Sequence, residues 1–185
     1  MKTELGELST RQKKPMGHGI EHEIYSSEKK PNVVFKVGEL DVINEWYEVF
    51  KSDPDIFPIV YKLGRTKTNN FYYVVLEKLD TQRFENDWDD MELSLEDVGV
   101  LDVDRGESFT DIYTLEGASS EKFIEIGKLL KNHDKSSYDF FIKFLTLLKK
   151  CERAQNKILN KDTLVDAHKY NFGYSEDGKL KCLDL

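Results

Sequence analysis

The chain has 185 residues, a hydrophobic fraction of 39%, an aromatic fraction of 12% and a formal net charge of −8 at pH 7. This composition supports one domain or two small lobes with a real core, and it argues against global disorder. The acidic balance disfavours sequence-independent binding to nucleic acid, because the phosphate backbone repels negative charge.

Targeting and cysteine patterns predict a cytoplasmic protein with no membrane partner. The first fifteen residues contain no apolar stretch of the kind that forms the centre of a signal peptide. No apolar run is long enough to cross a bilayer. The two cysteines, Cys151 and Cys182, are too few for a disulfide framework, as expected in a reducing compartment.

The first 79 residues are predicted to form an antiparallel sheet with one helix. Runs of β-branched and aromatic residues predict four strands, which end at Tyr25 or cover 33–37, 59–63 and 71–76. Apolar residues at helical spacing predict a helix over 41–51, and Asp41 is its candidate N-cap.

Residues 80–185 are predicted to be mainly helical. The segment 80–117 is strongly acidic, which is typical of a solvated face. Apolar spacing predicts three helices, over 87–95, 119–132 and 138–159. Near the end of the chain, short apolar segments predict strands at 163–165 and 179–183, on either side of a polar loop and a turn.

Three oxygen-bearing side chains frame this C-terminal hairpin. Asn171 follows Asp166 by five residues, and Asp184 follows Asn171 by thirteen. A single Asp or Asn in such a segment is usually a turn residue, whereas three between apolar strands are less easily explained that way. Hard cations prefer oxygen ligands of this kind, and the hairpin would return Asp184 to the neighbourhood of Asn171.

The segment Asp166-Ala167-His168-Lys169-Tyr170-Asn171 resembles the catalytic loop, D-x-x-x-x-N, of the protein-kinase-like superfamily. Its D-x-H-x-x-N form is closer to the aminoglycoside and choline kinase branch. Lys181-Cys182-Leu183-Asp184 resembles the strand that leads into the metal-binding Asp of that family. The resemblance implies that Asp166 is catalytic and that Asn171 and Asp184 hold Mg²⁺.

An upstream segment resembles the nucleotide-binding half of the same superfamily. Gly17-His18-Gly19 with the following Ile24 resembles a glycine-rich loop, and Val33-Val34-Phe35-Lys36 resembles V-A-I-K. This resemblance implies that Gly17, Gly19 and Ile24 contact ATP and that Lys36 neutralises its phosphates. The alternatives are a glycine pair in an ordinary turn and an edge-strand lysine that faces water.

The resemblance also assigns a helix residue and a connecting segment. A glutamate on the helix after Lys36 would pair with that lysine, and Glu45 and Glu48 are the two candidates. The segment from Glu77 to Leu79 resembles the hinge that contacts adenine through its backbone. Leu164-Val165 depart from the family pattern, which has His-Arg before the catalytic Asp.

These features together lead us to expect an α+β, two-lobed protein-kinase-like fold. Residues 1–79 would form an antiparallel-sheet N-lobe, and residues 80–185 a reduced helical C-lobe. The expected function is Mg²⁺-dependent transfer of phosphate from ATP to a hydroxyl of a protein or small molecule. The alternatives are a non-catalytic module that binds nucleotide or a protein partner, and an enzyme that transfers a nucleotidyl group.

Overall fold

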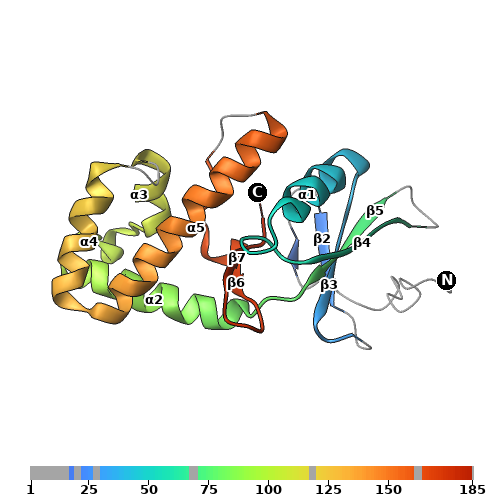
Figure 1. Ribbon diagram of the computed structural model, residues 1–185. Coiled ribbons are helices and arrows are strands. Elements are labelled where there is room, and N and C mark those ends of the chain that lie inside the picture. The colour runs from blue at the N-terminus through green and yellow to red at the C-terminus, as the bar shows by residue number, and fades with distance from the viewer. Residues whose placement is uncertain are drawn as a thin grey trace. The chain divides into compact units, whose positions relative to one another are not determined.

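The computed structural model describes residues 17–18, 22–26, 30–66, 71–116, 120–160 and 164–184, with only the backbone for residues 17, 18, 22 and 103. It is an α+β structure that divides into two compact units, Met1–Leu79 and Asp80–Leu185 (Figure 1). Each unit has its own core and is described separately below.

In the part of the first unit that the structure describes, five strands form an antiparallel sheet in the order β1-β2-β3-β5-β4. Its strands are β1 (Gly17–His18), β2 (His22–Ser26), β3 (Val33–Gly38), β4 (Val60–Arg65) and β5 (Tyr72–Glu77). The predicted strands at 33–37, 59–63 and 71–76 are therefore confirmed to within two residues at each end. The third strand lies at the centre of the sheet, hydrogen-bonded on both sides.

Alternation of side chains gives this sheet two different faces. Val33 and Phe35 of β3 lie in an apolar cluster with Tyr73 and Val75 of β5. Lys36 points to the opposite face, where it contacts the helix α1 (Leu40–Ser52). Figure 1 shows α1 lying beside the sheet. The buried residues of α1 recur at helical spacing: Ile43, Trp46, Val49 and Phe50.

The N-terminus of α1 corrects one prediction. The helix begins at Leu40, and its N-cap residue is Glu39, whose side chain makes no capping hydrogen bond. Asp41 is not the cap, because it lies inside the first turn. A carboxylate at that position still favours the helix, since it interacts with the positive end of the helix dipole.

The described residues of the second unit form four α-helices and a two-stranded hairpin. The helices are α2 (Thr81–Asp97), α3 (Phe109–Glu116), α4 (Glu121–His133) and α5 (Lys135–Leu159), with 3₁₀ turns η2 (Val103–Arg105) and η3 (Lys169–Asn171). The predicted helices at 119–132 and 138–159 are confirmed. The first predicted helix, 87–95, begins earlier than expected, because Asp80 caps it by accepting a hydrogen bond from the Arg83 N–H.

Aromatic rings fill the core of the second unit. Phe144 of α5 lies near its centre, with its ring centroid 4.8 Å from that of Phe172 and 5.4 Å from that of Trp88. Phe84 and Phe109 also pack against Phe144. Figure 1 shows α4 running alongside α5. Because these rings come from α2, α3, α5 and the hairpin, the cluster joins the hairpin to the helices.

The hairpin consists of β6 (Phe172–Tyr174) and β7 (Leu180–Cys182), which pair antiparallel. The predicted strand at 179–183 is confirmed in its central part. The predicted strand at 163–165 is wrong for its two described residues, Leu164 and Val165, which have no regular structure. The reason is that β7 takes its partner from the residues directly after Asn171, so no second partner is needed upstream.

Candidate functional site

Lys36 lies in the interior of the first unit. Its residue is only 2% exposed, and β3 is bonded to β2 on one side and β5 on the other. Its Nζ atom lies 3.4 Å from the centroid of the Trp46 ring and 5.7 Å from that of Phe50. The alternative of an edge-strand lysine facing water is therefore wrong, because Lys36 is on a central strand and buried.

The glycine-rich segment leads into the strand next to Lys36. Gly17 of β1 lies opposite Ile24 of β2, and Ile24 in turn lies opposite Lys36 of β3. Ile24 is half-buried. Gly19 lies outside the described residues. The structure thus brings Gly17, Ile24 and Lys36 into one row across three neighbouring strands.

The two candidate glutamates are both on α1 and both exposed. Glu45 immediately precedes Trp46, and Glu48 follows it by two residues. Trp46 and Phe50 supply the rings nearest the Lys36 amine. The pairing of Lys36 with Glu45 stays a prediction. Sequence analysis missed Trp46, although its place in the apolar repeat of the helix predicts that it faces the sheet.

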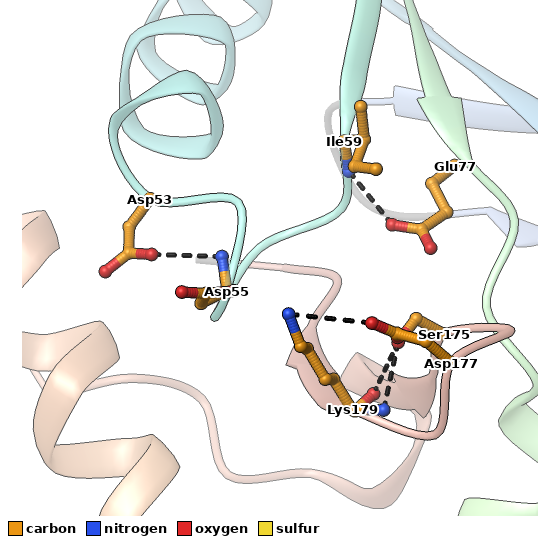
Figure 2. Close-up of polar contacts among 7 residues, drawn as sticks. All are labelled: Asp53, Asp55, Ile59, Glu77, Ser175, Asp177 and Lys179. Carbon is orange, nitrogen blue, oxygen red and sulfur yellow. Dashed lines mark hydrogen bonds and ion pairs between the residues drawn. The ribbon is translucent and has the colours of Figure 1, made fainter.

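The hinge-like segment is held at the end of β5 by paired hydrogen bonds. The Glu77 N–H donates to the Ile59 carbonyl oxygen at 2.9 Å, and the Ile59 N–H donates to Glu77 Oε2 at 3.1 Å (Figure 2). The Lys78 N–H donates to the Asn32 carbonyl oxygen. Leu79 is buried, and within the described ranges its backbone N–H donates no hydrogen bond.

The catalytic-loop residues contact one another in the second unit. The Asn171 side-chain nitrogen donates to Asp166 Oδ2 at 2.9 Å and to the Asp166 carbonyl oxygen at 3.2 Å. Asp166 is exposed and Asn171 is half-buried. Because Nδ2 of Asn171 donates to Asp166, any contact of Asn171 with a cation would be made by its Oδ1 atom.

Asp184 is tied to the same loop through its neighbour. The Leu183 N–H donates to the Asn171 carbonyl oxygen at 2.6 Å. The Cys182 thiol donates to the Asp184 carbonyl oxygen, and Asp184 itself is half-buried. Asp166, Asn171 and Asp184 therefore belong to one continuous set of hydrogen-bonded segments.

Contacts that the sequence did not predict fix the loop between Asp166 and Asn171. Ala167 is buried, and its carbonyl oxygen accepts a hydrogen bond from Thr110 Oγ1 at 3.0 Å. Lys169 Nζ lies 3.0 Å from Asp89 Oδ1. The hydrogen bond to Asp89 raises the pKa of Lys169. Residues of the loop that are anchored to α3 or α2, Ala167 through its carbonyl and Lys169 through its side chain, thus alternate with exposed residues.

The turn of the hairpin is closed by its own side chains. The Lys179 N–H donates to Ser175 Oγ at 3.0 Å, and the Ser175 hydroxyl donates to Asp177 (Figure 2). The hydrogen bond from Ser175 lowers the pKa of Asp177. Gly178 adopts a φ of +79°, which a residue with a side chain rarely adopts. The turn fixes the register that brings Leu183 to Asn171.

Acidic, histidine and cysteine side chains do not gather into a metal site in the part of the chain that the structure describes, where no group of three could hold an ion. A metal at this hairpin would therefore need ligands besides these side chains, such as the amide oxygen of Asn171 or groups from outside the protein. No helix of the described segments is long and apolar enough to cross a membrane. The sequence matches no protein-family model, and none of the curated proteins is similar to it.

Proposed function

We propose that the protein is an ATP-dependent phosphotransferase with a two-lobed, protein-kinase-like fold. The observation that carries this proposal is the double link of Asn171, which binds Asp166 through its side chain and Leu183, the neighbour of Asp184, through its carbonyl. Three residues at the spacing of a kinase catalytic loop and metal-binding Asp thus share one hydrogen-bonded hairpin. The buried lysine on the third strand of an antiparallel sheet adds support.

The donor set of the hairpin fits Mg²⁺. The Oδ1 atom of Asn171 and the carboxylate of Asp184 are hard oxygen donors, and both residues are accessible in part. Asn171 and Asp184 would hold the ion together with phosphate oxygens of ATP. The bound ion supplies neutralisation of the charge on the transferring phosphate.

The first unit supplies contacts for the nucleotide. The ammonium of Lys36 neutralises the α- and β-phosphates, and the Leu79 backbone N–H offers a donor to the edge of adenine. The neighbouring N–H groups of Glu77 and Lys78 already donate within the unit, so the Leu79 donor is the one suited to a ligand.

Asp166 acts on the acceptor. Its exposed carboxylate is oriented by Asn171, and it takes the proton of the acceptor hydroxyl as the hydroxyl oxygen attacks the γ-phosphorus of ATP. A new oxygen–phosphorus bond forms, the bond to the bridging oxygen of ADP breaks, and ADP leaves. The acceptor is a protein or small molecule that carries a hydroxyl.

A second candidate is a non-catalytic module that binds nucleotide through the same residues. Apolar Leu164 and Val165 stand where a kinase has His-Arg before the catalytic Asp, and Val165 is buried. This candidate shares the nucleotide contacts but gives Asp166 no catalytic task. If this candidate is right, the protein transfers no phosphate, and replacing Asp166 changes nothing that a transfer assay detects.

Thermal unfolding with and without ATP and Mg²⁺ tests the shared nucleotide site. A ligand that binds only the folded protein at 100-fold its Kd adds about 2.7 kcal/mol to the free energy of unfolding. We expect ATP with Mg²⁺ to raise the Tm of the wild type and to raise that of Lys36→Met much less. Lys51→Met, which alters an exposed lysine of α1, should keep the full shift. A wild-type Tm that does not respond to millimolar ATP and Mg²⁺ would refute the nucleotide site.

A further inference from the structure

The amine of Lys36 lies against two aromatic rings of α1. Its Nζ lies 3.4 Å from the centroid of Trp46, well inside the limit of about 6 Å for an attractive contact between a cation and a ring. Trp46 itself is only 7% exposed, and Phe50 contributes a second ring at 5.7 Å. The ammonium therefore rests against aromatic faces in the interior of the first unit.

The contact with these rings contributes to stabilising a buried charge. An ammonium taken out of water loses hydration, which favourable contacts inside the protein replace in part. The face of an indole carries negative electrostatic potential, and tryptophan is the strongest aromatic partner for a cation.

The position of the amine is set by the helix as well as by the strand. Trp46 is held in the core of the unit by the same apolar repeat that includes Ile43 and Val49, both fully buried. A displacement of the indole would change where the long, flexible side chain of Lys36 places its charge. We propose that Trp46 is a positioning residue that fixes the Lys36 ammonium where it meets the phosphates of the nucleotide. This inference rests on the proposed function.

Nuclear magnetic resonance tests the contact without any nucleotide. In protein labelled with ¹³C-lysine, the ε protons of Lys36 should be shifted upfield by the ring current of Trp46, and Lys36→Met assigns the signal. The upfield shift should persist in Trp46→Phe, which keeps a ring at this position, and fall sharply in Trp46→Leu, which leaves only the more distant Phe50 ring. A wild type without an upfield-shifted Lys36 signal would overturn the inference.

Affinity for ATP and Mg²⁺ tests the consequence of the contact. Trp46→Leu should weaken binding about tenfold, and Trp46→Phe should stay within about threefold of the wild type. Val49→Ala is the matched control, because it removes buried apolar volume from the same helix and keeps both Trp46 and Phe50. It should lower the Tm while leaving the Kd unchanged.

The outcomes separate this inference from the proposed function. If the wild type binds ATP with Mg²⁺ and Trp46→Leu binds it equally well, Trp46 does not position Lys36 and the inference is wrong. If Val49→Ala weakens binding as much as Trp46→Leu, the effect is one of general stability and the inference is again wrong. If the wild type binds no nucleotide, the proposed function is wrong. The inference, which rests on it, is then wrong too, even where the upfield signal is present.

Discussion

The two units place their candidate functional groups in opposite environments. The first unit buries a cation, since Lys36 is 2% exposed between a sheet and the rings of α1. The second unit builds its core from aromatic rings and leaves the carboxylate of Asp166 exposed on a loop. The candidate group of the first unit is therefore part of the packed interior, whereas the candidate carboxylate of the second unit lies outside its core.

The largest effect is expected in the aromatic core of the second unit. Phe144 is fully buried and contacts rings from three other elements, α2, α3 and β6, so its removal leaves a cavity at their junction. Phe144→Ala should lower the free energy of unfolding by about 3–5 kcal/mol, measured by urea denaturation. Ile142→Ala, which removes a partly exposed side chain two residues earlier on α5, should cost less than about 1 kcal/mol. Equal losses of unfolding free energy in the two variants would mean that Phe144 does not lie at the centre of the core of the second unit.

A smaller effect is expected at Lys36, the buried candidate group of the first unit. Lys36→Met removes the buried charge but keeps an unbranched side chain against Trp46, so stability should stay within about 1 kcal/mol of the wild type. Lys36→Ala also leaves a cavity and should cost more, about 2 kcal/mol. Urea denaturation without nucleotide measures both variants. A Lys36→Met variant as unstable as Lys36→Ala would mean that the charge itself stabilises the first unit.

The smallest effect is expected from acid at the N-terminus of α5. Hydrogen bonds from Ser137 lower the pKa of Asp134, which caps this helix. A lowered pKa means that the unfolded chain binds the proton more readily, so this contribution is present above about pH 4 and is lost as the pH falls further. Asp134→Asn should keep the cap at pH 7 and unfold with a weaker dependence on pH between about pH 4 and pH 2.

Asp104→Asn, which alters an exposed carboxylate of the same unit outside the helix caps, is the control for that measurement. Urea midpoints at pH 7 and pH 3 give the comparison. Between pH 7 and pH 3, the urea midpoint of Asp134→Asn should fall less than that of Asp104→Asn. The same loss in both would show that the cap does not contribute to acid sensitivity.

Periodicity predicted the elements whose residues face one core. The runs at 33–37 and 71–76 and the apolar spacing of 138–159 correspond to β3, β5 and α5. Periodicity failed where an element is short or its boundary depends on a side chain. The strand β6 is only Phe-Gly-Tyr, with a glycine at its centre, and the start of α2 depends on the Asp80 cap.

The sequence allowed a contact between two of the candidate residues to be expected, but not the environment of each residue. Spacing alone allowed Asn171 to reach Asp166, and the structure shows that contact. Burial of Lys36 could not be predicted, because β3 alternates Val34 and Lys36 on one face and nothing local indicates that a helix covers that face. The contact between the Lys36 amine and the Trp46 ring depends on two elements, β3 and α1, that meet only after folding.

Transfer of radiolabelled phosphate from ATP tests the central proposal most directly. Purified wild type and Asp166→Ala are incubated with labelled ATP and Mg²⁺, first alone and then with a cell lysate as the source of acceptors. We expect Mg²⁺-dependent labelling by the wild type and none by Asp166→Ala, whose Tm still rises with ATP because Asp166 is exposed and is not among the groups proposed to hold ATP or Mg²⁺. Equal labelling by the two proteins, or none by the wild type in either setting, would contradict a phosphotransferase that uses Asp166.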